Sequence, residues 1–203
     1  YRHELKYTIT KKDAEILKQR LALLMDIDSN GENGYFIRSL YFDTPYSSAY
    51  YEKLDGVLYR KKYRIRIYNH NNSFIRLEKK LKHNNMTSKN QTRITKELCQ
   101  NIIEGKSFEF KSNDKLLNEF LLEIKTKGLK PSIIVDYYRM AFTYPVSDVR
   151  VTFDYNIKSG RYNYDIFDEN IVSEPVIENN LLVLEVKFNE VLPEAIAIIL
   201  KTI

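Results

Sequence analysis

One cysteine and no tryptophan occur among the 203 residues of this chain. Because Cys99 has no second thiol to join, an internal disulfide is excluded, which is typical of proteins in a reducing compartment. No apolar run approaches the roughly 20 residues that span a bilayer, and no signal peptide is visible. We therefore expect a cytoplasmic protein without a membrane segment.

Several well-known catalytic patterns are also missing. His3, His70 and His83 show no metal-ligand spacing. No Gly-x-x-x-x-Gly-Lys loop is present, so this is not a P-loop protein. No pairing of serine or cysteine with histidine suggests nucleophilic catalysis, and Cys99 is expected to pack within a helix. The candidate chemistry therefore lies in the charged side chains.

Composition favours a basic, sheet-rich domain. Lys and Arg outnumber Asp and Glu by 32 to 27, which gives a net charge of +5, and the aromatic residues are 16 Tyr and 10 Phe. Tyrosine-rich segments favour sheet, and the charge gives a mild preference for anions. Two tyrosine pairs, Tyr50–Tyr51 and Tyr137–Tyr138, could stack on a nucleobase, although such pairs are more often core or sheet-surface residues. We expect a single domain over residues 1–203.

Alternation and turn signals predict an antiparallel sheet with a few helices, which is an α+β fold. Strands are expected at residues 2–9, 35–42, 59–68, 73–82, 89–94, 132–144, 148–155 and 181–188. Residues 69–72 are the predicted turn of a hairpin, and residues 158–180 are expected to be irregular. Helices are expected between Thr10 and Asn30–Gly31, at 95–103, at 113–124 and from Pro193 onward.

Charged residues stand two positions apart in four stretches, 64–66, 78–82, 150–154 and 185–187. Since residues i and i+2 of a strand share a face, each stretch has one charged and one mostly apolar face. About eight strands can close into a barrel or tunnel, with the charges facing a wet interior. The residues expected to face outward under the helices are Ile65, Ile67, Leu77, Val151, Phe153, Leu184 and Val186. An open sheet with its charges in bulk solvent predicts the same alternation.

The basic residues of these charged faces are candidate phosphate ligands. Arg64 and Arg66 share one face, and an arginine fork matches phosphate oxygens. Lys80 and Lys82 share a face of the neighbouring strand, and four more cations lie on other strands, namely Lys6, Arg139, Arg150 and Lys187. Gathered in one cavity, these charges would repel one another unless an anion entered. The alternative is a solvated face with scattered ion pairs.

Three glutamates, Glu4, Glu78 and Glu185, each precede a lysine by two residues. Carboxylate oxygens suit Mg²⁺ or Mn²⁺, which bind through one or two carboxylates plus phosphates and water. The alternative for each glutamate is an ion pair with the lysine on its own strand. Asp154 is either a further ligand or, as we favour, the partner that orients Arg150.

An ordered series of short motifs runs through nearly the whole chain. In sequence they are RHELKY at 2–7, SLYFDT at 39–44, EKLDG at 52–56, KYRIRIY at 62–68, LEKK at 77–80, DYYRMAF at 136–142, RVTFD at 150–154 and LEVKF at 184–188. This series resembles the VTC domain, the polyphosphate polymerase domain of the vacuolar transporter chaperone proteins. That domain belongs to the triphosphate tunnel metalloenzymes, which are relatives of the CYTH enzymes.

The resemblance implies an eight-stranded antiparallel tunnel whose basic side chains hold a nucleoside triphosphate or polyphosphate. Its phosphate-binding positions fall on Lys6, Arg64, Arg66, Lys80, Arg139 and Arg150. Its Mn²⁺ or Mg²⁺ position falls on Glu185, with Glu4 and Glu78 as auxiliary acids. The chain departs from the family pattern at Gln91, where a cation is expected. Lys89 and Arg93 are the candidate substitutes, and Lys82 is a further candidate phosphate ligand.

The function that the resemblance implies is metal-dependent phosphotransfer from ATP to polyphosphate. Catalysis would rest on positioning and charge neutralisation, without a covalent enzyme intermediate. Two alternatives stay open, a triphosphate hydrolase and a non-catalytic module that binds polyphosphate or nucleotide. Nucleic acid is not expected as a partner, because a closed tunnel would exclude duplexes and the chain has no extended basic stripe.

Overall fold

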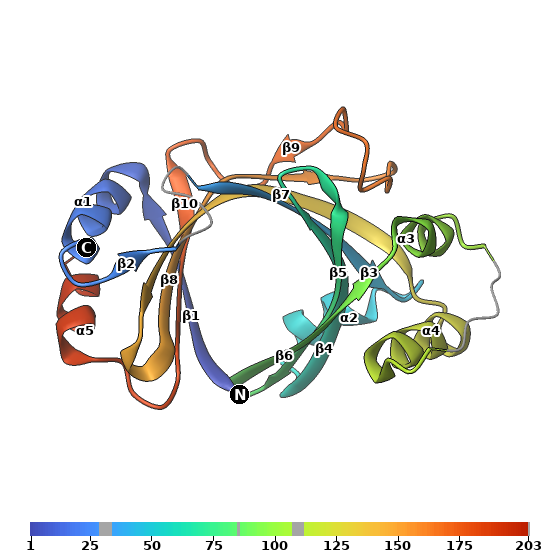
Figure 1. Ribbon diagram of the computed structural model, residues 1–203, viewed down its shortest axis with the longest axis horizontal. Helices are drawn as coiled ribbons and strands as arrows, with labels where there is room; N and C mark the ends of the chain where they lie inside the picture. Colours follow the sequence, from blue (N-terminus) through green and yellow to red (C-terminus); the bar gives the residue numbers. More distant parts are fainter. Residues whose placement is uncertain (29–33, 85, 107–111, 203) are drawn as a thin grey trace.

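The computed structural model of this chain describes residues 1–28, 34–84, 86–106 and 112–202. Eight strands form one antiparallel ring in the order β7, β3, β4, β5, β6, β1, β10, β8, and β8 pairs again with β7 (Figure 1). Their bounds are β1 Arg2–Thr10, β3 Tyr35–Asp43, β4 Tyr59–Tyr68, β5 Asn71–His83, β6 Met86–Ile94, β7 Lys130–Tyr144, β8 Val149–Gly160 and β10 Leu181–Phe188. The predicted α+β fold with a closed antiparallel ring is therefore confirmed.

The β4–β5 hairpin forms where the sequence predicts it. Tyr68 pairs with Asn71, and the two residues between them, Asn69 and His70, have φ values of 48° and 54°. A tight hairpin turn needs positive φ at both central positions, which asparagine tolerates better than most residues. Asn69 also joins the turn to β3, because its Oδ1 accepts a hydrogen bond of 2.8 Å from Phe36 N.

The shortest strand pairing in the ring is the one between β1 and β6. β1 and β6 pair only at Arg2 with Thr87 and at His3 with Met86. The other junctions are much longer, and β7 and β8 are paired from Ile134–Gly160 to Tyr144–Val149. Closure thus depends on contacts between the two ends of the chain and its middle, which no local sequence pattern specifies.

Helices cover two opposite outer sides of the ring, as Figure 1 shows. On one side lie α1 (Lys11–Leu21) and α5 (Glu194–Leu200), and on the other lie α3 (Lys96–Ile103) and α4 (Lys115–Lys127). Under α3 and α4 a buried core contains Ile65, Ile67 and Leu77. Under α1 and α5 a second buried core contains Val151, Phe153, Leu184 and Val186. The outward orientation expected for these seven residues is confirmed.

Local capping begins three of the helices. The side chains of Thr10, Thr95 and Asp114 each accept a hydrogen bond from the backbone N–H three residues on, at 3.1, 3.1 and 2.9 Å. Such caps each stabilise a helix by about 1 kcal/mol. The first helix ends at Leu21, so its boundary is earlier than the sequence indicates, and the predicted end at Asn30–Gly31 lies outside the described residues.

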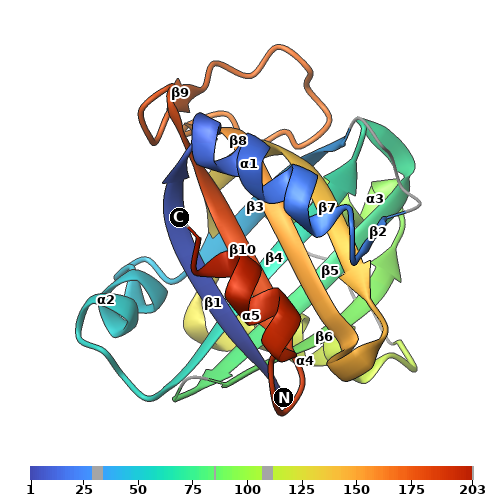
Figure 2. The same ribbon diagram turned by 90° about the vertical axis from the view of Figure 1, so that its left-hand side faces the viewer.

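Four short elements were not predicted, one of which is the 3-10 helix at Val146–Asp148 between β7 and β8. β2 (Asp26–Ile27) and β9 (Glu174–Pro175) are two-residue strands, and β9 lies in the segment expected to be irregular. The fourth is α2 (Ser48–Leu54), which projects from one end of the ring (Figure 2). None of its residues is buried, so it lacks the apolar stripe that reveals a helix in a sequence. None of the helices within the described ranges is long and apolar enough to cross a membrane.

Candidate functional site

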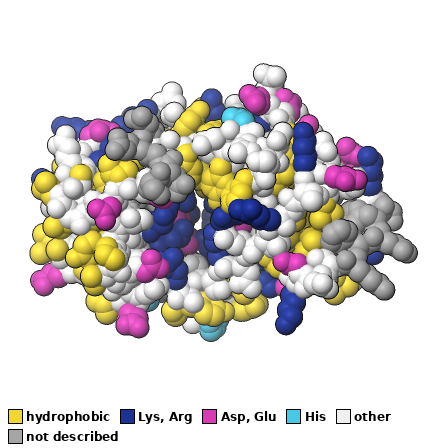
Figure 3. Space-filling view, viewed as in Figure 1, with side chains coloured by type: hydrophobic (Ala, Val, Ile, Leu, Met, Phe, Trp, Pro, Cys, Tyr) yellow, Lys and Arg dark blue, Asp and Glu magenta, His cyan; other side chains and the backbone are white. Residues whose placement is uncertain are grey.

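The ring encloses a cavity of about 1780 Å³. In the space-filling view, Lys and Arg side chains gather in the central hollow (Figure 3). Four carboxylates also line it, namely Glu4, Asp43, Asp154 and Glu185. The lining cations at predicted positions are Lys6, Arg64, Arg66, Lys80, Lys82, Lys89, Arg139, Arg150 and Lys187. The charged faces therefore point into the ring, which decides between a tunnel and an open sheet.

Arg64 and Glu78 form the first charged group of the tunnel. They are cross-strand partners on β4 and β5, and Arg64 Nε lies 2.7 Å from Glu78 Oε2. Lys89 Nζ lies 3.2 Å from the other carboxylate oxygen. Burial raises the pKa of Glu78, but the charges of Arg64, Arg66 and Lys89 lower it to about 2. Glu78 is therefore ionised and fully enclosed by cations.

Arg66 is held mainly by neutral partners. Its Nε donates to Ser39 Oγ at 3.0 Å, and its Nη2 donates to the phenol oxygen of Tyr137 at 2.8 Å. The nearest carboxylate contact is 3.9 Å, from Nη1 to Glu78. Neutral partners orient the guanidinium without cancelling its charge, which suits it to an incoming anion. Tyr137 is thus part of the tunnel wall, whereas Tyr138 packs outside beside Phe36.

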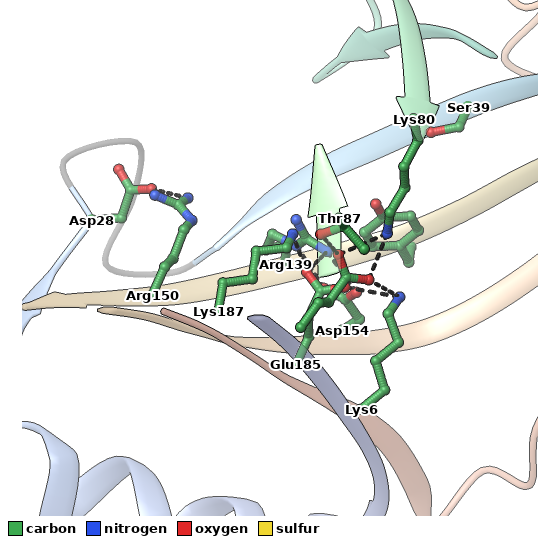
Figure 4. Close-up of polar contacts among 12 residues, drawn as sticks. Lys6, Asp28, Ser39, Lys80, Thr87, Arg139, Arg150, Asp154, Glu185 and Lys187 are labelled. Carbon is green, nitrogen blue, oxygen red and sulfur yellow. Dashed lines mark hydrogen bonds and ion pairs between the residues drawn. The ribbon is translucent and has the colours of Figure 1, made fainter. Parts of the chain in front are cut away.

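Glu4 and Glu185 belong to a second charged group. Figure 4 shows Glu185 of this group together with Lys6, Lys80 and Lys187. Lys80 Nζ lies 2.5 and 2.7 Å from the two carboxylate oxygens of Glu4. Lys6 Nζ lies 2.8 Å from Glu185 and 3.8 Å from Glu4, so it bridges both acids. Lys187 forms an ion pair with Glu185 as well. Burial raises the pKa of Glu185, but Lys187, Lys6 and Arg139 hold it well below its usual value.

The sequence-based assignment of Asp154 is wrong. Its carboxylate accepts two hydrogen bonds of 2.7 Å from Arg139, while Arg150 contacts Asp28 and the phenol oxygen of Tyr35 instead. Arg139 and Asp154 are directly opposite on β7 and β8. Arg150 lies four residues from Asp154 on one strand, a separation of about 13 Å. At Asp154 the cross-strand neighbour therefore prevails over the neighbour four residues away on the same strand.

Two groups of the tunnel have a pKa close to 8. Burial raises the pKa of Tyr41, but Arg64 and Arg66 beside it lower the value to about 8. Arg64 Nη1 donates a hydrogen bond of 3.0 Å to the Tyr41 phenol oxygen. Burial lowers the pKa of Lys187 to about 8, despite the opposing charge of Glu185. The net charge of the tunnel therefore falls as the pH rises above neutrality.

Lys89, on the strand after the hairpin (β6), partly replaces the cation that is missing at Gln91. Gln91 pairs with Glu78 across the strands, and its side-chain oxygen accepts a hydrogen bond of 3.0 Å from Arg76. Lys89 reaches Glu78 and lines the cavity. Arg93 does not line it, because its guanidinium lies over the Phe74 ring at 4.3 Å near the hairpin end.

The predicted metal ligands are only partly brought together. Within the residues that the structure describes, no group of three or more His, Cys, Asp or Glu side chains is arranged to hold a metal ion. Glu4 and Glu185 are neighbours through Lys6, whereas Glu78 is enclosed by Arg64 and Lys89. Two carboxylates still fit Mg²⁺ or Mn²⁺, since these ions take their remaining ligands from phosphate and water.

Several lining residues were missed by sequence reasoning. They are Tyr41, Arg60, Lys62, Arg76 and Arg161. The signal for two of them was available, because Arg60 and Lys62 continue the same alternating face of β4 as Arg64 and Arg66. It was available for a third as well, because Arg76 continues the face of β5 that carries Glu78, Lys80 and Lys82. Only the closed ring brings Tyr41 and Arg161 to the same cavity.

Comparisons with known proteins agree with this geometry. The family model of the VTC domain matches residues 1–202. A candidate adenylate cyclase (bh2851) from Bacillus halodurans has a similar structure, with a TM-score of 0.57, 15% identity, and coverage of 98% of this chain and 86% of that chain. The candidate adenylyl cyclase HpAC1 from Hippeastrum, described as having a dominant triphosphatase activity, has a TM-score of 0.50, 14% identity, and coverage of 99% and 85%. No curated protein matches the sequence.

Proposed function

The chain belongs to the VTC domain family, and on that premise we propose that it is a metal-dependent phosphotransferase acting on triphosphates inside its tunnel. The observation that carries the proposal is the closed ring with an excess of inward-facing cations over carboxylates. Such an interior attracts a polyanion and excludes bulky competitors. A linear triphosphate or polyphosphate chain has the charge and the narrow cross-section that this cavity fits.

The reaction we propose is transfer of the γ-phosphate of ATP to a polyphosphate end. A terminal oxygen of the acceptor attacks the γ-phosphorus, the bond to the β,γ-bridging oxygen breaks, and ADP leaves with that oxygen. Arg64, Arg66 and Arg139 would orient the phosphates and offset the charge that develops on their oxygens. The neutral partners of Arg66, which fix its guanidinium without cancelling it, support this role.

Glu4 and Glu185 would hold the divalent metal ion, which supplies further charge neutralisation at phosphate oxygens when bound. Lys6 bridges these two acids and would offset their mutual repulsion until the substrate and metal arrive. No covalent enzyme intermediate is needed. Cys99 lies in the core under α3, and burial raises the pKa of its thiol to about 12, so it is not a nucleophile.

Product analysis tests this proposal. Protein incubated with ATP and Mn²⁺ should yield ADP and polyphosphate, and Arg66→Ala should abolish turnover while keeping the fold. Lys12→Ala, on the exposed side of α1, is the matched control and should be fully active. Full activity of the Arg66 variant would contradict the site assignment.

Triphosphate hydrolysis is the second candidate, favoured by the likeness to a protein described as having dominant triphosphatase activity. Water would then replace the polyphosphate acceptor at the same γ-phosphorus. Orthophosphate without any chain longer than the substrate would identify this activity. Binding without turnover in any divalent metal would instead indicate a sensor.

A further inference from the structure

The segment around α2 forms a fixed rim at one end of the tunnel. Asp43 Oδ1 accepts hydrogen bonds from the backbone N–H groups of Thr44 and Ala49, at 2.8 and 2.9 Å. At the other end of the helix, Arg60 Nη1 donates to the carbonyl oxygens of Lys53 and Glu52, at 3.2 and 3.4 Å. Both anchors, Asp43 and Arg60, also line the cavity. The helix is therefore held in place by tunnel residues although it buries none of its own.

Two aromatic side chains of this helix are open to the cavity. Tyr50 and Tyr51 line it, yet they are 56% and 55% exposed, and their rings meet edge to face at 5.3 Å. Tyr46 and Leu58 are exposed nearby, at 85% and 66%, but neither is among the described residues that line the cavity. Exposed rings at the mouth of a charged cavity are suited to stacking with a planar ligand.

Cations beneath these rings lack acidic partners. Lys53, Arg60 and Lys62 line the same end of the cavity. Among residues 1–28, 34–84, 86–106 and 112–202, no carboxylate lies within 4.0 Å of their charged nitrogens. Burial lowers the pKa of Lys62, and the charge of Lys53 lowers it further. Asp43, beyond ion-pair distance, partly opposes this shift. Three neighbouring cations with no carboxylate at ion-pair distance indicate a place for an anion.

Together these features point to a nucleotide. We propose that Tyr50 and Tyr51 bind the base of a nucleoside polyphosphate, while Lys53, Arg60 and Lys62 hold the phosphates next to the ribose. Arg60, Lys62, Arg64 and Arg66 face inward along β4 in steps of about 6.6 Å. This row would lead the terminal phosphate to the tunnel centre. The inference rests on the proposed function and adds the residues that bind the nucleoside and the end of the tunnel at which it binds.

The opposite end of the tunnel is less suited to a base. Phe74, an aromatic residue that lines that end, is half-buried and already lies against two guanidinium groups, those of Arg76 at 4.5 Å and Arg93 at 4.3 Å. Tyr68 packs on the same ring, with centroids 6.1 Å apart. A ligand would have to displace these contacts to stack there. At the α2 rim no such displacement is needed, because solvent covers the two tyrosines.

The test compares two ligands that share a triphosphate and differ in the nucleoside. Dissociation constants for ATP and for tripolyphosphate are measured by titration calorimetry with the wild-type protein and with Tyr50→Ala/Tyr51→Ala. We expect the double variant to bind ATP about tenfold more weakly and tripolyphosphate unchanged, since base–aromatic stacking is lost without loss of charge. Tyr50→Phe/Tyr51→Phe should restore ATP binding, and Tyr46→Ala/Leu58→Ala is the matched exposed control.

Every other outcome of this experiment contradicts nucleotide binding at the rim, and the outcomes differ from one another. An equal loss for both ligands would make the tyrosines structural supports. Unchanged ATP affinity would remove them from the site, and if the variant also abolished self-association, the rim would be a protein contact. In both cases tripolyphosphate binding by the wild type would leave the proposed function standing. A wild-type protein that binds neither ligand overturns the proposed function together with the rim.

Discussion

The centre of the tunnel and its α2 rim use the same residue types in opposite ways. At the centre, Glu78 and Glu185 each lie within 4 Å of at least two cations. At the rim, Lys53 and Lys62 have no such partner among the described residues. A paired charge is part of the fold, because removing it strands its partner in a buried place. An unpaired charge is instead available to a ligand.

The comparison predicts where substitutions affect stability and where they affect binding alone. Centre residues should change both, since their ion pairs are buried. Rim residues should change affinity with little cost to the fold, because they make few contacts and already repel one another. Four experiments, in order of decreasing expected effect, test this difference between the centre and the rim.

Arg139→Ala should have the largest effect on stability. It leaves Asp154, which is buried, without its two hydrogen bonds of 2.7 Å, and it also removes a charge 3.8 Å from Glu185. We expect the free energy of unfolding in urea to fall by about 3–5 kcal/mol. The double variant Arg139→Ala/Asp154→Ala should recover part of that loss. Equal stability of the wild type and the single variant would show that the centre is not preorganised by its ion pairs.

At the centre, Glu185→Gln should lower turnover and metal affinity while it preserves the fold. It keeps the shape of the side chain but removes the charge that Lys6 and Lys187 contact. We expect turnover to fall by about 100-fold or more, and Mn²⁺ affinity, followed by electron paramagnetic resonance in the presence of tripolyphosphate, to fall by more than about tenfold. Wild-type Mn²⁺ affinity in this variant would remove Glu185 from the metal site.

Lys62→Met should show the behaviour of the rim. Because burial and Lys53 already disfavour its charge, we expect stability to change by no more than about 0.5 kcal/mol. Tripolyphosphate should bind about fivefold more weakly at low salt, and the difference should shrink as salt rises. Lys12→Met on α1 is the control. A stability loss as large as that of the Arg139 variant would erase the contrast between rim and centre.

A pH titration should give the smallest effect. The phenol of Tyr41 is neutral below its pKa of about 8 and becomes a phenolate above it, which adds a negative charge beside Arg64 and Arg66. A bound polyanion disfavours that phenolate, so tripolyphosphate affinity should fall as the pH rises through about 8. We expect a decrease of about threefold, and a smaller one in Tyr41→Phe, where Lys187, whose pKa is also about 8, still loses its positive charge. Identical pH profiles for the two proteins would contradict the shifted pKa.

Much of the fold was predictable because its signals are local. The turn at Asn69–His70 requires positive φ, and helix α3 begins at a threonine that caps it. The α2 helix was not predictable, since its order comes from contacts with Asp43 and Arg60 and no apolar stripe marks it. The partner of Asp154 was misassigned for a related reason, because strand register is set between segments and is not visible within one.

The sequence by itself determined which residues share a face, because side-chain direction along a strand alternates with a period of two. It could not determine whether the charged face of each strand meets solvent or a shared cavity, since an open sheet and a closed ring have the same alternation. That was decided by the tertiary structure, through the pairing of β7 with β8 and of β1 with β6. Closure brings distant cations together, and only their proximity makes a polyanion site.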